Sequence, residues 1–410
     1  MAKIELMKSS TLNNICHFSV KYIINNYFIL LALDGFFTMT GMTDMAKFGI
    51  LLRLAGFIFL IEKLRHGASL FDYGLFIFAV SLTLISAGKN YPGELYKAGL
   101  GQMYAILFFF VGRCSYKFKM EPISKGMVPF IIVCSIGLYL YVTAPTWYLE
   151  YKLGDTDPNN TLNVLEMSRL SAFWPYPYWV SYGCGIMFLY LIINIYNGKY
   201  EGAKYSFILT YIFLISILAQ QRAPLALIVG SSILAWLFSL SKNNQSGRQI
   251  RKYMQYIAVL LIATISLVFS YLDFETLEYL ISKINVLQDG SGFVEDRASS
   301  YNHFFKKGLS LTGDGIGRYS HTAHSMGLDA ITDNNYYLIL FESGFYGFIG
   351  YIVVFIIVYL KGLFNAHSHL FEMGVISMYL ISMLGANSIA SGQEHNYIFW
   401  YCCGRIMTQK

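Results

Sequence analysis

Two arginines stand where an isolated positive charge could contact a negatively charged partner. Arg222 lies in SILAQQRAPLALIVG, between two long apolar runs, with only Ala223 before Pro224. A charge at a membrane boundary usually faces a cavity or a partner, although an arginine at a helix end can also extend to the membrane surface. Arg297 lies in SGFVEDRASSYNHF directly after two carboxylates, so a surface ion pair is the alternative for this residue.

A second group of chemically active side chains occupies the stretch GLSLTGDGIGRYSHTAHSMGLDAITDNNYYLILFESGFYG. It brings together Arg318, His321, His324, Asp333 and Glu342. Imidazole and carboxylate groups are the side chains that most often transfer protons in enzymes. Glu342 lies one turn inside an apolar run, so it could either bond to a neighbouring helix or line a cavity. This stretch is therefore the first place to look for catalysis.

The same sequence does not match two common binding motifs. The alternate glycines from Gly313 to Gly317 permit a tight backbone, but no strand and helix flank them as in a dinucleotide site. His321 and His324 are three residues apart with no third His or Cys nearby, which favours an ordinary polar loop over a metal site. Asp155 and Asp157 form a D-x-D pair within GDTDPNN, a composition typical of a turn. The sequence predicts no metal and no cofactor.

The composition indicates which elements position these side chains. Of the 410 residues, 55% are hydrophobic and 13% are charged, about half the charged fraction of soluble domains. An ordinary water-soluble protein is thereby excluded. Several stretches without charge are near the ~20 residues that span a bilayer as a helix. We expect an all-α polytopic membrane protein with about twelve transmembrane helices: a first one after MAKIELMKSS, and others near 45–61, 70–88, 98–115, 126–145, 176–197, 204–221, 224–240, 253–272, 336–360, 370–390 and 395–407.

The basic residues set the expected orientation of these helices. With the N-terminus in the cytoplasm, most of them fall on the cytoplasmic side, and the short outer loops hold only Lys47, Lys89, Lys97 and Arg222. Short cytoplasmic loops are typically rich in Lys and Arg, so both termini are expected to be cytoplasmic. The net charge of +6 is then a topology signal. It does not indicate a nucleic-acid partner, because the basic residues do not cluster in one domain.

Two long polar segments, 146–175 and 273–335, then lie on the exterior side. In the second, apolar residues recur at helical spacing from Leu277 to Leu287, which predicts a helix on the membrane surface. A further helix is expected from Phe293 to Lys307, with Gly308 ending it. The six cysteines lie in or beside apolar runs, so exterior disulfides are not expected. Residues 1–410 are read as a single integral membrane domain with an exterior cap.

Four features occur in order between about residues 220 and 350. They are QQRAPLAL after a span, Arg297 and Tyr301 as R-x-x-x-Y in the exterior loop, G-x-G-x-G, and DNNYYLILFESGFYG entering a span. This arrangement resembles the O-antigen polymerase and O-antigen ligase superfamily. The resemblance implies a metal-independent, all-helical glycosyltransferase of the bacterial inner membrane. Such an enzyme moves a glycan from undecaprenyl diphosphate to a sugar hydroxyl on the periplasmic face.

The resemblance also implies roles for individual residues. Arg222 and Arg297 match the arginines thought to hold the diphosphate, and Arg318 is a further candidate for that contact. Ligases enter this span at a His-Asn pair, where this chain has Asp333 and Asn334. That difference favours a polymerase of lipid-linked repeat units of O-antigen, or a related surface polysaccharide, over a ligase. Its partners would be the lipid-linked glycan, membrane lipid and a chain-length regulator protein.

Two alternatives to a polymerase follow from the sequence. One is the O-antigen ligase, which attaches finished chains to lipid A-core. The other, from a different class, is a polysaccharide flippase or other secondary transporter. Such transporters usually show two repeated halves, and no internal repeat is visible here.

We predict that Asp333→Asn lowers polymer formation by roughly 10² to 10⁴ fold, the usual contribution of a general base. Asp333 precedes a span, and a carboxylate there could take the proton from the attacking hydroxyl. His324, His321 and Glu342 follow it as candidates. The measurement is a gel of surface polysaccharide from cells carrying each variant. Near-normal polymer with Asp333→Asn, alongside loss with His324→Ala, would move the role to the histidine.

Overall fold

The structure is a computed structural model of the 410-residue chain. It describes residues 18–39, 48–143, 145, 147–148, 170–172, 174, 177–200, 202–219, 222–241, 304–306, 308–331, 334–385, 389 and 396–408. Within these ranges the regular structure is helical throughout, with no strand. The span expected at 253–272, the helix expected from Leu277 to Leu287, and most of the segments 146–175 and 273–335 lie outside the described residues.

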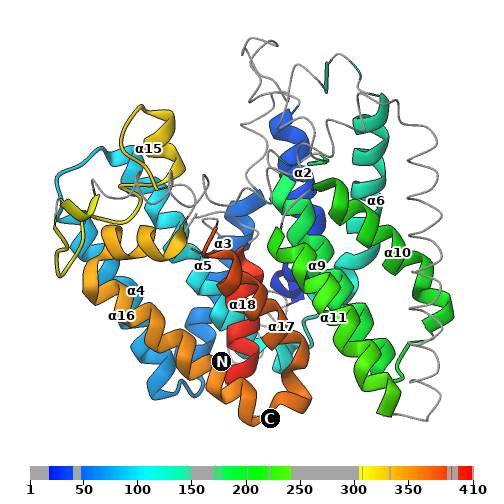
Figure 1. Ribbon diagram of the computed structural model, residues 1–410. Helices are drawn as coiled ribbons and strands as arrows, with labels where there is room; N and C mark the ends of the chain where they lie inside the picture. The colour runs from blue at the N-terminus through cyan, green and yellow to red at the C-terminus, as the bar shows by residue number, and fades with distance from the viewer. Residues whose placement is uncertain are drawn as a thin grey trace, which may run out of the picture.

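Helices occupy every apolar run that falls within the described residues (Figure 1). Five of them are long and apolar enough to cross a membrane: α4 (Leu70–Ala87), α5 (Gly93–Phe118), α6 (Pro122–Thr143), the Trp179–Tyr196 part of α9 (Pro177–Tyr196) and α16 (Asn335–Phe364). The others are α2 (Tyr27–Met39), α3 (Phe48–Arg65), α10 (Gly202–Ala219), α11 (Arg222–Ser241), α15 (His321–Ser325), α17 (Ala366–Ser382) and α18 (Tyr397–Met407). The prediction of a helical membrane protein is confirmed.

The expected number of about twelve spans is not confirmed. Among the described residues, five helices qualify by length and composition, or six if Phe18–Asn25 and Tyr27–Phe37, which meet at a bend of 67°, form one span. Three of the other helices do not qualify as spans, for different physical reasons. α3 carries Arg53 and three further charges near its end. α17 and α18 have only 17 and 11 residues, and 11 residues rise about 16 Å, roughly half of a bilayer core.

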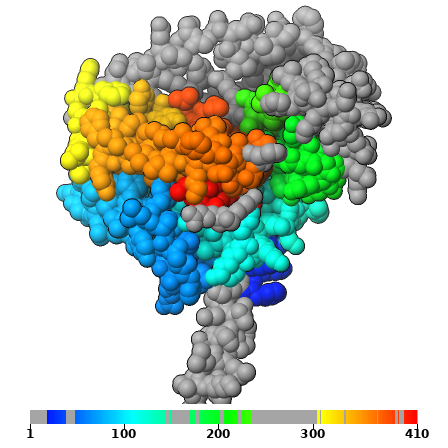
Figure 2. All heavy atoms as spheres, turned by 90° about the horizontal axis from the view of Figure 1, so that it is seen from below, coloured from blue at the N-terminus to red at the C-terminus, as the bar shows by residue number. Residues whose placement is uncertain are grey.

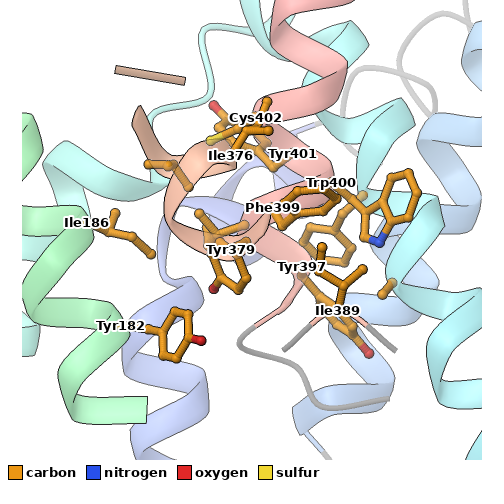
Figure 3. Packing of buried hydrophobic residues seen from close by; sticks show 14 of the residues in the cluster. Tyr182, Ile186, Ile376, Tyr379, Ile389, Tyr397, Phe399, Trp400, Tyr401 and Cys402 are labelled. Carbon is orange, nitrogen blue, oxygen red and sulfur yellow. The ribbon is translucent and has the colours of Figure 1, made fainter. Parts of the chain in front are cut away.

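α18 is short because it is a core element. Each of its residues is buried except Arg405, which is half-buried. Phe108 of α5 packs on Tyr397 of α18 with ring centroids 4.4 Å apart, and Phe355 of α16 meets Phe399 edge to face at 5.5 Å. Figure 3 shows the aromatic side chains of α18 among residues from the neighbouring helices. Van der Waals packing of this kind is the main attraction between helices in a membrane.

Glycines let α5 and α18 approach backbone to backbone. A Cβ on Gly112 would lie 2.1 Å from the carbonyl oxygen of Tyr401, and one on Gly404 would lie 2.0 Å from the carbonyl oxygen of Phe109. Both distances are shorter than van der Waals contact allows. Small residues at a helix interface are the usual means of close packing in membranes.

The helices have two chemically different ends. At the "basic end", Arg113 forms a bidentate pair with Asp72 at 2.8 Å, and Lys361 donates to the carbonyl oxygen of Met407 at 3.0 Å. The opposite "loop end" consists of the end of α4, the start of α5, the start of α16 and the segment 308–331 between them. In Figure 1, α15 of this segment lies at the end opposite the C-terminus.

Basic residues are unequally divided between the two ends. Among the described residues, the basic end holds most of them: Lys63, Arg65, Arg113, Lys117, Lys119, Lys125, Lys199, Lys361 and Arg405. The loop end holds fewer: Lys89, Lys97, Arg222, Lys306 and Arg318. The bias has the direction that the sequence predicts for a cytoplasmic basic end.

We predict that Gly404→Ala lowers the midpoint of thermal unfolding in detergent, because the added methyl group would force α18 away from α5. Overpacking of this kind costs about 1–3 kcal/mol. Gly74→Ala is the control: its Cβ would meet no atom within 4 Å, and alanine favours a helix over glycine by about 1 kcal/mol. Equal unfolding midpoints for Gly404→Ala and the wild type would contradict this account of α18.

Candidate functional site

The segment 308–331 is held by a break in α16. At Gly344 the backbone leaves helical geometry, with φ 66° and ψ −168°. The amides of Asp314 and Gly315 donate to the carbonyl oxygens of Phe341 and Glu342, each at 2.9 Å. On the other side of the break, the amides of Phe345 and Tyr346 donate to the carbonyl oxygens of residues 310 and 311 at 3.3 and 3.0 Å. The loop therefore satisfies the backbone groups that the break exposes.

Two glycines make this contact possible. A Cβ on Gly344 would lie 2.3 Å from the amide nitrogen of Gly313, and one on Gly313 would lie 2.3 Å from the carbonyl oxygen of Glu342. Both residues have positive φ, which favours glycine. The G-x-G-x-G stretch thus forms a tight backbone, as the sequence predicts. The glycine is needed because the loop packs directly against the backbone of α16 at its break.

Glu342 ties the loop to two helices through its side chain. The carboxylate is buried, with 1% of the residue exposed. It accepts hydrogen bonds from Gln102 Nε2 of α5 at 3.0 Å and from the amide of Tyr319 at 2.9 Å. Of the two alternatives that the sequence left open for Glu342, this geometry favours bonding to neighbouring elements. A carboxylate so enclosed positions the loop.

Further contacts fix the other side of the loop against α4 and α5. Tyr91 donates its hydroxyl to the carbonyl oxygen of Ile316 at 2.9 Å, and Ser86 accepts the amide of Ile316 at 3.0 Å. Lys89 donates to Thr312 Oγ1 at 3.0 Å. Together with the contacts to α16, these bonds clamp residues 310–319 from two sides.

Arg318 projects from this clamped loop with its side chain half-buried. Its backbone amide donates to the carbonyl oxygen of Gly315 at 3.2 Å, and within the described part of the chain its guanidinium forms no hydrogen bond or ion pair. Burial raises the pKa of both Tyr91 and Tyr319, and the nearby Arg318 charge opposes the shift in each case. Tyr319 is neutral and donates its hydroxyl to Asp314. A guanidinium on a clamped loop, without a carboxylate partner among the described residues, is suited to binding an anion.

The two histidines lie directly after this arginine on the one-turn helix α15, and both are exposed. Ile331 then returns to the loop, donating its amide to the carbonyl oxygen of Tyr319 at 2.9 Å. Asn334 begins α16 by accepting the amide of Tyr337 at 3.1 Å. No group of three or more His, Cys, Asp or Glu side chains placed to hold a metal occurs among the described residues.

Several candidate residues fall outside what the structure describes. Arg297, Asp333, Asp155 and Asp157 are not among the described residues, so their predicted roles stay predictions. The helix expected to stop at Gly308 is described only at 304–306, which are helical, and Gly308 has the positive φ of 83° typical of a helix stop.

Arg222 begins α11, as the position before Pro224 predicts. A Cβ on Gly185 of α9 would lie 3.3 Å from Pro224 Cβ and 3.0 Å from Met378 Sδ of α17. Five residues further along α17, about 7.5 Å of helix rise, the carbonyl oxygen of Met383 accepts the amide of Asn335 at 2.9 Å. The starts of α11 and α16 therefore lie at the same end of the bundle, the loop end.

The sequence analysis missed the residues that hold the loop in place. Gln102 is a polar side chain inside an apolar run, and that mismatch is the one signal that could have identified it. Tyr319 and Gly344 carry no such signal, because a tyrosine in a loop and a glycine in an apolar helix are both ordinary.

Comparison with known proteins adds no further identification. No protein family, no curated protein and no solved structure matches the chain significantly.

We predict that Glu342→Leu loosens the loop while Glu342→Gln keeps it docked. Leucine would leave the Gln102 amide and the Tyr319 amide without an acceptor, and each such loss costs about 1–3 kcal/mol. A glutamine at position 342 can accept the amide of Tyr319 with its side-chain oxygen. It can also donate its side-chain NH₂ to the side-chain oxygen of Gln102 once the Gln102 amide group rotates by about 180°. Trypsin cleavage after Lys306 or Arg318 measures the difference.

The control for this experiment is Glu94→Gln, which removes an exposed charge at the start of α5. Its cleavage rate should equal that of the wild type. If Glu342→Leu is cleaved no faster than this control, the carboxylate does not hold the loop.

Proposed function

We propose that the chain is a membrane glycosyltransferase that polymerises undecaprenyl-diphosphate-linked repeat units of O-antigen or a related surface polysaccharide. The observation that carries the proposal is the clamped loop: residues 310–319 are fixed to α4, α5 and α16, and they present Arg318 at the loop end of a helical membrane domain. The starts of α11, at Arg222, and of α16 lie at the same end. A lipid-linked diphosphate would reach these groups from the adjacent bilayer.

The orientation of the chain supports this assignment. The basic end is cytoplasmic by the usual distribution of Lys and Arg, so the loop end faces the exterior. For a bacterial inner membrane this side is the periplasm, where lipid-linked repeats are joined.

In the proposed scheme, the reaction places two requirements on the candidate residues. The acceptor hydroxyl forms a bond to the anomeric carbon of the donor glycan, and the bond from that carbon to the diphosphate oxygen breaks. Arginine groups at Arg222, Arg297 and Arg318 stabilise the negative charge that develops on the leaving diphosphate. A general base takes the hydroxyl proton, with Asp333 first and His324 next among the candidates. No metal is required in this scheme.

A transporter is the second candidate from a different class, and the loop argues against it. Alternating access needs elements that move around a central site. The described candidates Arg318, His321 and His324 lie instead on the segment 308–331, which many hydrogen bonds hold at one end of the bundle. A loop held in this way favours a reaction at the membrane surface over transport across the membrane.

Deletion of the gene distinguishes the candidates on a gel of surface polysaccharide. Glycans with a single repeat unit indicate a polymerase. Bare core with accumulated carrier-linked polymer indicates a ligase. Loss of all glycan, including single repeats, indicates export.

We predict that Arg318→Ala and Arg222→Ala each abolish polymer while the protein stays in the membrane at its normal level, and Arg297→Ala should do the same. Arg→Lys at these positions should restore polymer only in part, because an ammonium group cannot form the bidentate contact. Lys97→Ala is the matched control, since Lys97 is an exposed cation at the same end. Full-length polymer from any of the three alanine variants would remove that residue from the diphosphate site.

A further inference from the structure

A cavity of about 260 Å³ opens at the basic end, away from the segment 308–331. Four elements meet there: the α5–α6 turn with Glu121, the end of α9 and the residues after it with Asn194 and Lys199, the start of α17 with Glu372, and α18 with Arg405. Figure 2 views this end of the molecule, with the α16–α17 stretch in orange and the C-terminal residues in red. The proposed polymerase chemistry uses none of these residues.

The cavity is lined by an ion pair with spare hydrogen-bonding capacity. Arg405 Nε donates to Glu372 Oε1 at 2.6 Å. Its two terminal nitrogens donate to the hydroxyls of Tyr401 at 3.3 Å and Tyr116 at 3.0 Å. A guanidinium has five N–H groups, and these bonds use three of them. The remaining two have no partner among the described residues.

The other charged groups around the cavity are also incompletely bonded. The Lys199 ammonium is exposed and has no partner in the described part of the chain. Glu372 Oε2 lies 3.8 Å from His369 Nδ1, too far for a direct hydrogen bond. Glu121 accepts one hydrogen bond, from Ser124 Oγ at 3.2 Å. The cavity therefore offers free donors on cations and free acceptors on carboxylates.

This charge pattern determines which ligand fits. Two carboxylates and two cations line one small space, so a simple anion would meet Glu121 and Glu372, and a simple cation would meet Lys199 and Arg405. A molecule that carries both signs pairs with both sets. An ammonium group would also gain from aromatic faces, and Tyr190 and Phe371, whose rings meet edge to face at 5.8 Å, line the same cavity.

The size and depth of the cavity narrow the ligand further. Its volume is below the 300–1,000 Å³ or so of sites for drug-sized ligands. It lies at helix ends beside exposed lysines, which is the depth of lipid headgroups. Arginine and lysine together favour phosphate as the anionic part.

We propose that this cavity binds a phosphoethanolamine-type zwitterion, with the phosphate at Arg405 and Lys199 and the ammonium at Glu372 and Glu121. The zwitterion is either the headgroup of a phosphatidylethanolamine lipid of the cytoplasmic leaflet or a free small molecule. This site is separate from the polymerase site at the loop end.

The test measures binding to the purified full-length chain. Free phosphoethanolamine is titrated against the protein in detergent, and phosphatidylethanolamine, phosphatidylcholine and phosphatidylglycerol are compared in nanodiscs by the midpoint of thermal unfolding. We expect phosphatidylethanolamine to raise the midpoint above both other lipids. Binding of free phosphoethanolamine as well would identify a soluble ligand, and stabilisation by the lipid alone would identify the headgroup.

Variants at exposed positions make the test specific without disturbing the core. Lys199→Gln and Glu121→Gln should each weaken binding about tenfold, the effect of losing one charge-assisted contact of about 1.4 kcal/mol. Lys125→Gln removes an exposed cation at the same end that does not line the cavity, and it should bind as the wild type does. Equal stabilisation by all three lipids without binding of free phosphoethanolamine, a preference for phosphatidylglycerol, or unchanged binding by Lys199→Gln would overturn the proposal.

Discussion

The structure of the loop end depends on one constraint: backbone amides and carbonyls within a membrane domain must be paired. The break at Gly344 removes the helical partners of the carbonyls of Phe341 and Glu342 and of the two amides after Gly344. Residues 310–315 supply all four partners. Each buried group left unpaired would cost several kcal/mol, so the break and the loop stabilise each other. These four backbone hydrogen bonds therefore determine where the loop carries Arg318 and how the chain returns to α16.

These four backbone hydrogen bonds alone do not explain why the docked loop is more stable than an unbroken α16. In an unbroken helix the amides of Phe345 and Tyr346 would pair with the carbonyls of Phe341 and Glu342, so the backbone could satisfy the same four groups without the loop. The preference comes from side chains that only the docked loop engages. The Glu342 carboxylate accepts the amide of Tyr319, and the Tyr91 hydroxyl donates to Ile316. These contacts, together with glycine at both crowded positions, make the broken form of α16 the stable one.

The positions of the described helices could be predicted from the sequence. The contacts between residues of different helices could not. The apolar run at 70–88 became α4 (Leu70–Ala87) because its limits are set locally, by Ser69 capping the helix with Asp72 and by charge at the far end. The break in α16 has no local sign, since the run from residue 343 to 360 is uncharged and reads as one helix. Glu342 and Gln102 are 240 residues apart, and nothing in either neighbourhood indicates the other. The cavity at the basic end is lined by four elements far apart in the sequence, so no single motif could reveal it.

The two ends of the bundle treat their cations differently, and that difference bears on function. At the basic end, the buried Arg113 is paired with Asp72, so its guanidinium carries its own counter-charge. At the loop end, Arg318 is half-buried, its charge acts on Tyr91 and Tyr319, and it has no ion pair among the described residues. Burying a charge without a partner costs free energy unless another molecule supplies the counter-charge. An incoming anion recovers that cost at Arg318, whereas at Arg113 it would have to displace a carboxylate.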